Sequence, residues 1–478
     1  MSNFINMDTA EIFISANCNL NCKYCYISKN ESIPELDNKV ISALEDGTYL
    51  QALKKSFPDP GKLKKLELWG GEPLLGMKVI TKHIKEYFDC FPNLKSIYLS
   101  TNFAYHVEDL LLFLQKLSEL DREIAIEIQI SLDGPAPVTM LSRGAKVNEL
   151  IEANLEMCAQ ALSEINLRKV KVNFKFKSTL SLDNIDYLSE RENVIAYFSY
   201  FAKIAERFNQ NCINKNISFR SGSMPNFVVP GQYTTEDGRR FFELIRTLED
   251  THEYCKSQGL LQNYSTFNFL NNNVKKAITI YNKGFKNMPL GFCGGLKSKA
   301  AVLYDGNMMV CHRAFFDYHQ EYRDRVKENN DLLERKVMYN PNSLVEHAAR
   351  YSMLNPSDEH DFAKISRRME FIYKYQKLQI SAIMANICEL AYCGQVDSIY
   401  LQDEELLAKS ALVVKLYPNC LYDNILTTGS FYLRDFSLVR LFCNGALEYL
   451  FSKINSSVCQ SKQNPTQTAI PGAWSDRE

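Results

Sequence analysis

Alternating apolar and polar positions divide the first 220 residues of the chain into strand-like and helix-like stretches. Six stretches rich in Ile, Val, Phe and Tyr predict strands, and amphipathic stretches such as 109–120 and 144–162 predict helices between them. The strands are EIFISA (11–16), LKKLELWG (63–70), KSIYLST (95–101), IAIEIQISLDG (124–134), KVKVNFKFKS (169–178) and NISFRSG (216–222). Six strand-then-helix units predict an α/β fold, a partial (β/α)6 TIM-type barrel with a parallel sheet and outer helices. In such a barrel the functional residues lie at the carboxyl ends of the strands.

The pattern changes beyond the sixth strand. Residues 221–238 have turn chemistry, 239–255 predict a helix, and 291–316 predict a hairpin that turns at Asp305-Gly306. Residues 320–395 are charged and helical in pattern, and the polar end of the chain predicts disorder. We therefore expect a barrel (1–235), a helical connection (236–290), a cysteine-containing region with a helical insertion (291–455) and a disordered tail (456–478).

Composition narrows the classes of function. Lys and Arg number 55 against 56 Asp and Glu, without a basic stripe, so neither nucleic acid nor an anionic membrane is an expected partner. No apolar run reaches membrane-spanning length, and the N-terminus does not have the pattern of a signal peptide. We expect a cytoplasmic protein. Disulfides are rare in that compartment, so a tight group among the 14 cysteines predicts metal binding.

Such a group follows the first strand, in ANCNLNCKYCYIS (16–28). Cys18, Cys22 and Cys25 have the spacing C-x3-C-x2-C, and the next cysteine is Cys90. A structural zinc ion needs four protein ligands, whereas three thiolates on a four-iron cluster leave one iron open to an outside ligand. The alternatives are core cysteines or part of a split zinc site. We expect a cluster at the barrel mouth, with Tyr24 beside it.

The GGEP segment ends the second strand. Gly70 and Gly71 would let the backbone approach a ligand closely, and Pro73 fixes the turn. The Glu72 carboxylate can accept from an ammonium group. Taken alone, this segment is an ordinary strand-to-helix turn.

The third and fourth strands also end in polar motifs. In LSTNF (99–103), Ser100 and Asn102 suit either ribose hydroxyls or helix N-caps. In SLDGP (131–135), Ser131 and Asp133 are followed by Arg143, whose forked donors suit a carboxylate. A lone arginine in a loop is usually a solvated charge. Motifs at three successive strand ends indicate one shared ligand.

The cysteine loop, with an aromatic residue before its last cysteine, resembles the signature of the radical SAM superfamily. The resemblance implies that the open iron chelates the amino and carboxylate groups of S-adenosylmethionine. One electron then splits the C5′–S bond, and the resulting 5′-deoxyadenosyl radical abstracts a substrate hydrogen.

The other motifs extend this resemblance. The family has a GGEP motif that binds the methionine amino group, which implies that role for the segment from Gly70 to Pro73. It commonly has T-N-G after the third strand, where this chain has Phe103 instead of glycine. In its peptide-modifying branch, SLDGP is followed by an arginine, and the serine and arginine hold the methionine carboxylate. Ser131, Asp133 and Arg143 match that pattern.

The C-terminal cysteines resemble a further part of the family. Cys293 and Cys311 bracket the predicted hairpin as at the start of a SPASM or twitch extension, which holds one or two auxiliary iron–sulfur clusters. A full SPASM continues with a compact C-x2-C-x5-C-x3-C. This chain instead has Cys388, Cys393, Cys420 and Cys443. We expect one auxiliary cluster among these six candidate ligands, although Cys388 and Cys393 also suit an apolar core.

The resemblance implies a peptide- or protein-modifying oxidoreductase, similar to anaerobic sulfatase maturases, that forms a crosslink, an oxidised residue or an epimer. Its partners would be the peptide or protein substrate and a flavodoxin or ferredoxin as reductant. Only 17 residues precede Cys18, so we expect leader recognition through another chain or residues 320–395. The alternatives are a radical SAM enzyme with a small-molecule substrate, or a non-catalytic iron–sulfur or zinc protein. No catalytic side chain is identified from the sequence.

Overall fold

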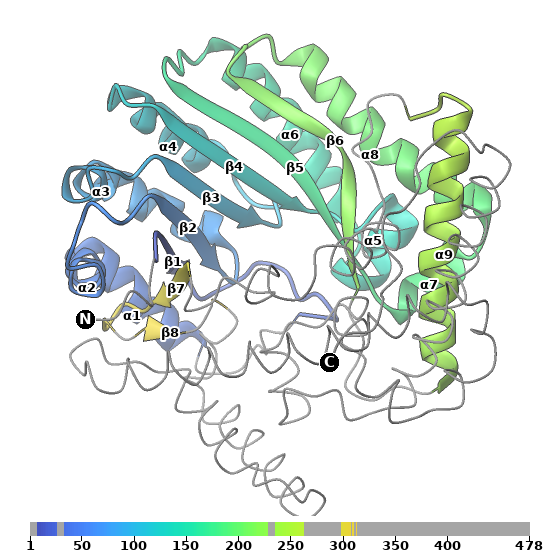
Figure 1. Cartoon of the computed structure of the whole chain (residues 1–478), viewed down its shortest axis with the longest axis horizontal. Helices are drawn as coiled ribbons and strands as arrows, with labels where there is room; N and C mark the ends of the chain where they lie inside the picture. The colour runs from blue at the N-terminus through green and yellow to red at the C-terminus, as the bar shows by residue number, and fades with distance from the viewer. Residues whose placement is uncertain are drawn as a thin grey trace, which may run out of the picture.

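A curved parallel sheet with helices along one side forms the frame of the molecule (Figure 1). The computed structural model describes residues 7–25, 33–227, 235–261, 298–306, 308–309 and 312. The strands are β1 (Thr9–Ser15), β2 (Lys65–Gly70), β3 (Ser96–Thr101), β4 (Ile124–Ser131), β5 (Val170–Leu180), β6 (Ile217–Phe227), β7 (Lys299–Val302) and β8 (Met308–Met309). The helices are α1 (Ile33–Glu45), α2 (Thr48–Ser56), η1 (Pro73–Gly76), α3 (Met77–Cys90), α4 (Glu108–Glu119), α5 (Ala136–Arg143), α6 (Val147–Glu164), α7 (Leu182–Leu188), α8 (Arg191–Asn211) and α9 (Thr235–Ser257).

The period of two along each strand separates the two faces of this sheet. One row of neighbours in register is apolar and buried, and it packs with the helices: Ile12, Leu68, Leu99, Ile128, Phe174 and Phe219. The adjacent row faces the other way and is polar: Glu11, Glu67, Tyr98, Glu127, Asn173 and Ser218. The sequence pattern therefore produces a core between sheet and helices and a polar inner face.

The six predicted strands are all present and pair in parallel in the order β1 to β6. One expectation needs correction, because the sheet has a seventh parallel strand. The predicted hairpin forms between β7 and β8, but β7 also pairs in parallel with β1, with Thr9 opposite Lys299. Tyr49 of α2 fastens this addition, since its hydroxyl accepts from Phe13 N at 2.8 Å and donates to Val302 O at 2.7 Å.

A second correction concerns residues 221–238, which have turn chemistry in the sequence. The structure continues β6 to Phe227, and α9 begins at Thr235. Strand β5 pairs with this extension as far as the Leu180–Phe227 pair. Pairing with a long neighbouring strand thus overrides the local turn preference of Ser, Gly and Pro.

The helices follow the predicted apolar periodicity. In α3, for example, Met77, Ile80, Ile84 and Tyr87 are buried at spacings of three or four residues. None of the helices in the described ranges combines the length and the hydropathy needed to cross a bilayer. Residues 262–297, 310–311 and 313–478 lie outside the description, so the domain boundaries at 290 and 455, the helical insertion and the tail stay predictions.

Candidate functional site

The three-cysteine loop begins at the carboxyl end of β1, where Asp37 of α1 holds its backbone. One carboxylate oxygen of Asp37 accepts from Ala16 N at 2.7 Å, from Ser15 Oγ at 2.8 Å and from Asn17 N at 3.2 Å. Hydrogen bonds to an ionised acceptor are stronger than neutral ones. The start of the loop is therefore fixed to a helix rather than to solvent.

The three cysteine side chains gather beyond this anchor. Cys25 N donates to Cys22 O at 3.1 Å, and Lys23 N donates to Ser142 O at 2.9 Å, which ties the loop to α5. Burial, together with the nearby charges of Glu72, Cys22 and Cys25, raises the pKa of the Cys18 thiol to about 12. The sulfurs are thus close enough to repel one another as thiolates, a cost that iron would remove.

The donor set fits a cluster better than a single metal ion. Within the described residues no cysteine is in a disulfide, and no group of His, Cys, Asp or Glu is arranged around one metal ion. Three thiolates are one fewer than a structural zinc ion needs, whereas three can hold a four-iron cluster. This favours iron–sulfur over the split zinc site.

Gly70 and Gly71 lie against the end of β1 and the start of the loop. A Cβ on Gly70 would be 2.3 Å from Ser15 O, and one on Gly71 would be 2.3 Å from Asn17 O. Two backbone hydrogen bonds join the same segments, from Gly71 N to Ser15 O at 3.1 Å and from Glu72 N to Asn17 O at 2.7 Å. In the described residues these glycines therefore serve the packing of the chain on itself.

Glu72 is fully buried and caps the short helix η1, which begins at Pro73. Its Oε1 accepts from Leu74 N at 3.0 Å and from Thr101 Oγ1 at 2.6 Å, and its Oε2 accepts from Asn102 N at 2.6 Å. Burial raises the pKa of Glu72 to about 7, against the lowering effect of these donors and of the Arg143 charge. This carboxylate links the ends of β2 and β3.

The end of β3 faces the cysteine loop. Asn102 Nδ2 donates to Asn19 Oδ1 at 2.8 Å and lies 3.7 Å from Cys18 Sγ, while Ser100 Oγ accepts from Gln129 at 3.1 Å. The N-cap alternative is wrong, because α4 begins at Glu108 after Val107. Phe103, at the position of the family's glycine, has a left-handed φ of 56°.

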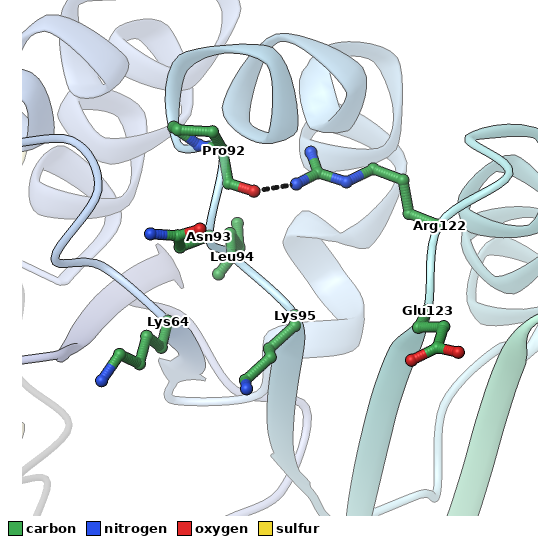
Figure 2. Close-up of a pocket in the computed structure, with 7 residues that line it drawn as sticks. All are labelled: Lys64, Pro92, Asn93, Leu94, Lys95, Arg122 and Glu123. Atoms are coloured by element: carbon green, nitrogen blue, oxygen red, sulfur yellow. Dashed lines mark hydrogen bonds between the residues drawn. The ribbon is translucent and has the colours of Figure 1, made fainter.

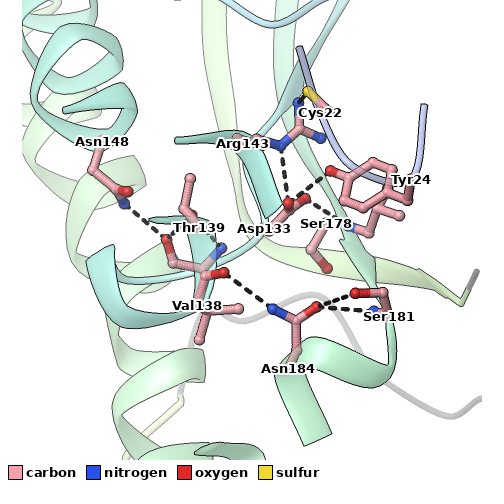
Figure 3. Close-up of polar contacts among 12 residues, drawn as sticks. Cys22, Tyr24, Asp133, Val138, Thr139, Arg143, Asn148, Ser178, Ser181 and Asn184 are labelled. Atoms are coloured by element: carbon pink, nitrogen blue, oxygen red, sulfur yellow. Dashed lines mark hydrogen bonds and ion pairs between the residues drawn. The ribbon is translucent and has the colours of Figure 1, made fainter. Parts of the chain in front are cut away.

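The end of β4 carries a buried ion pair. Arg143 Nε lies 3.0 Å from Asp133 Oδ2, and the same oxygen accepts from Tyr24 OH at 2.6 Å (Figure 3). Figure 3 shows the guanidinium between Asp133 and Cys22, with NH1 3.9 Å from Cys22 Sγ. Ser131 ends β4 nearby and is half-buried. The SLDGP motif, Arg143 and Tyr24 thus meet at the cysteine loop.

The helix that carries Arg143 is held in place by buried amides. Asn148 Nδ2 donates to Gly134 O at 2.8 Å, and Asn184 Nδ2 donates to Val138 O at 3.0 Å. These contacts link the turn before α5 to α6, and α5 itself to α7 (Figure 3). The position of Arg143 is therefore set by the fold.

Two further groups of residues make contacts that the sequence analysis does not predict. Asp37 is one, and an acidic residue inside a helix carries no signal of its role. The other lies on the polar inner face of the sheet, where the His312 ring stacks on Trp69 at 3.5 Å and lies 3.2 Å from Glu11. Lys299 also pairs with Glu11.

A surface pocket lies at the opposite, amino-terminal ends of the strands (Figure 2). Its lining includes Lys64, Lys95 and Arg122, which precede β2, β3 and β4. Arg122 donates hydrogen bonds to two backbone carbonyl oxygens, Phe88 O at 2.8 Å and Pro92 O. The pocket is therefore separate from the cysteine loop.

The candidate ligands of an auxiliary cluster lie outside the described residues: Cys293, Cys311, Cys388, Cys393, Cys420 and Cys443.

Residues 10–152 match the family model of a 4Fe-4S single cluster domain. The match includes the cysteine loop and the three motifs that meet it. This match agrees with the resemblance to the radical SAM superfamily. In the structure the cysteine loop and the three motifs lie together at the carboxyl-terminal edge of the sheet.

Two curated proteins are similar to this chain. An uncharacterised protein of Methanocaldococcus jannaschii is 26% identical over 182 residues, which make up 37% of this chain and 54% of that protein. A probable GTP 3′,8-cyclase of Methanococcus aeolicus is 27% identical over 257 residues, 51% of this chain and 78% of that protein. The chain thus spans about half the length of the first relative.

Solved structures of Streptococcus suis SuiB are also similar. The form bound to S-adenosylmethionine has 13% identity and a TM-score of 0.37, over 66% of this chain and 60% of that one. The form bound to the precursor peptide SuiA has 13% identity and a TM-score of 0.38, over 64% and 60%. A likeness at this level does not bear on the assignment.

Proposed function

We propose that the chain is a radical SAM enzyme that modifies a peptide or protein. The proposal of radical SAM chemistry rests on one observation, which is that the three-cysteine loop is attached to the ends of β2, β3 and β4. Bound together, a [4Fe–4S] cluster and S-adenosylmethionine supply an adenosyl radical that removes a hydrogen atom from a substrate. The residues of the chain bind and orient these groups.

Glu72 would hold the methionine ammonium group. A carboxylate has about four acceptor positions, and the three described donors leave one of them on Oε2. The fixed donors also hold the carboxylate still, so little ordering is needed when a ligand binds. A cation there would replace part of the solvation that Glu72 loses by burial.

Arg143 would hold the methionine carboxylate, together with Ser131. Its charge acts on Glu72, so an anion site and a cation site lie within electrostatic reach of each other. An amino acid carries those two charges on one carbon atom. This pairing supports S-adenosylmethionine over a ligand with a single charge, while Ser100 and Asn102 remain the proposed ribose contacts.

The proposal of a peptide or protein substrate depends on the resemblance of Cys293 and Cys311 to a SPASM or twitch extension. The proposal of one auxiliary cluster depends on the same resemblance. A second candidate is a small-molecule substrate. The curated relative named as a probable GTP 3′,8-cyclase favours it, because most of that protein's length is matched. Both candidates use the same cysteine loop.

The test measures iron, sulfide and S-adenosylmethionine cleavage after anaerobic reconstitution. Wild type should bind at least one four-iron cluster and release 5′-deoxyadenosine under dithionite. The variant with Cys18→Ala, Cys22→Ala and Cys25→Ala should release none, and any iron that it retains reports an auxiliary cluster. Cys90→Ala, outside the motif, is the matched control. A wild type without a cluster would refute the proposal, and a cluster without cleavage would favour the non-catalytic alternative.

The substrate class needs its own measurement. Reconstituted enzyme with deuterated peptides or with deuterated nucleotides should transfer deuterium into 5′-deoxyadenosine only for the correct class. Transfer from a peptide Cα or side chain supports the first candidate. Transfer from a nucleotide alone would replace it with the second.

A further inference from the structure

The Asp133 carboxylate joins three separate parts of the site. It is fully buried at the end of β4. Its Oδ2 accepts from Tyr24 OH of the cysteine loop and pairs with Arg143 Nε of α5, and its Oδ1 accepts from Thr179 N of β5 at 2.9 Å (Figure 3). The resemblance implies contact between Asp133 and the cofactor, but its oxygens are directed to protein donors.

We propose that Asp133 is a positioning residue that orients Arg143 toward the carboxylate of S-adenosylmethionine. This inference rests on the proposed function. A negative carboxylate beside a ligand carboxylate would repel it, whereas the guanidinium lies between Asp133 and the cysteine loop. Asp133 therefore acts through Arg143 and does not touch the ligand.

The geometry of the guanidinium decides which of its edges is available. Nε lies 3.0 Å from Asp133 Oδ2 in an ion pair without hydrogen-bond geometry, and NH1 lies 3.9 Å from Cys22 Sγ. The two terminal nitrogens form the end of the fork, which is the edge that grips a carboxylate with two parallel hydrogen bonds. Asp133 thus holds the side edge and leaves that end for the ligand.

Burial makes this orientation dependent on Asp133. The Arg143 side chain is 6% exposed, and a buried cation without a partner is strongly disfavoured. An arginine side chain also loses rotamer entropy when it is fixed. The ion pair with Asp133 offsets the burial of the cation and fixes the side chain before the ligand binds, so Arg143 is preorganised.

The test compares binding of S-adenosylmethionine with binding of its decarboxylated form, by equilibrium dialysis with anaerobically reconstituted protein. Wild type should prefer S-adenosylmethionine. Asp133→Asn keeps the size of the side chain and removes its charge. It should weaken S-adenosylmethionine binding by about ten- to hundredfold, the loss of one or two charged hydrogen bonds, and leave the decarboxylated ligand nearly unchanged.

The selective loss separates positioning from a general structural defect, which would weaken both ligands equally. Asp133→Glu, which keeps the charge but displaces the guanidinium, should show the same selectivity. Asp183→Asn removes an exposed carboxylate that pairs with Lys23 at 3.7 Å, and it is the matched control. Equal losses for both ligands, or loss of iron from both Asp133 variants, would overturn the inference. A wild type without any preference would instead overturn the proposed function of Arg143.

Discussion

Gly71 lies so close to Asn17 that a Cβ on the glycine would be 2.3 Å from the Asn17 carbonyl oxygen. Gly71→Ala must therefore move the start of the cysteine loop. We expect a lower iron content after reconstitution and a loss of about 1–3 kcal/mol in the free energy of unfolding, as for other overpacked sites. Iron analysis and urea denaturation measure the two effects.

Gly61→Ala is the matched control for that substitution. A Cβ there meets only side-chain atoms, of Asp59 at 3.3 Å and Asn93 at 3.4 Å, which can move aside. We expect nearly wild-type iron and stability. Equal effects of the two substitutions would show that contact with Asn17 is not the reason for glycine at position 71.

Asp37→Ala tests the anchor of the cysteine loop. Removal of the carboxylate leaves the buried Ala16 N without an acceptor, which costs about 1–3 kcal/mol, whereas Asn17 N still has Ser15 Oγ at 3.2 Å. We expect slower cluster loading and faster iron release to a chelator. Glu35→Gln removes an exposed carboxylate from the same helix and should have little effect. An unchanged release rate in Asp37→Ala would show that the loop does not depend on this anchor.

Phe103→Gly relieves backbone strain and removes a buried aromatic ring at the same time. The left-handed φ of 56° costs a side-chain-bearing residue about 1–2 kcal/mol. The ring is fully buried against Phe174, and removal of a buried aromatic ring costs about 3–5 kcal/mol. We expect a net destabilisation of about 2 kcal/mol in thermal or urea unfolding. A more stable variant would mean that the ring does little more than occupy the family's glycine position.

We expect the buried Glu11 carboxylate to make the free energy of unfolding depend on pH. Burial alone would raise the pKa of Glu11, but His312 and Lys299 together lower it from 4.5 to about 2. Because the folded-state pKa is the lower one, the stabilisation is complete above pH 4.5 and is lost as the pH falls toward 2. A shift of this size corresponds to about 3 kcal/mol.

The measurement is urea unfolding of wild type and Glu11→Gln from pH 7 to pH 3. The variant should be less stable at pH 7, and the difference should shrink below pH 4.5. Glu149→Gln, which removes an exposed charge, should follow wild type throughout. A constant difference between wild type and Glu11→Gln would contradict the assigned pKa.

The strands and the site motifs could be read from the sequence because their signals are local. Alternation in IAIEIQIS marks β4, and GGEP and SLDGP mark the turns that follow two strands. The pairing of β7 with β1 could not be read, since a four-residue strand does not specify a distant partner. The hydrogen bond from Tyr49 to Val302, for example, spans 253 positions.

The roles of single residues were harder to predict than their location. Gly70 and Gly71 were expected to make room for a ligand, yet the atoms nearest to them belong to the chain itself. Asp133 was assigned to the cofactor, but its partners come from β5, α5 and the cysteine loop. Such roles depend on tertiary contacts, which no local pattern encodes.

The position of β7 beside β1 sets an order of events during biosynthesis. All residues that the proposed cofactor site uses have been made once Arg143 leaves the ribosome, whereas the outer edge of β1 gains its partner only when Val302 follows. At about 5–20 residues per second, roughly 10–30 s separate the two events. During that interval the nascent chain presents a complete set of three thiols beside an unfinished sheet edge. The ligands of the proposed cluster are therefore synthesised before the strand that completes this edge of the sheet.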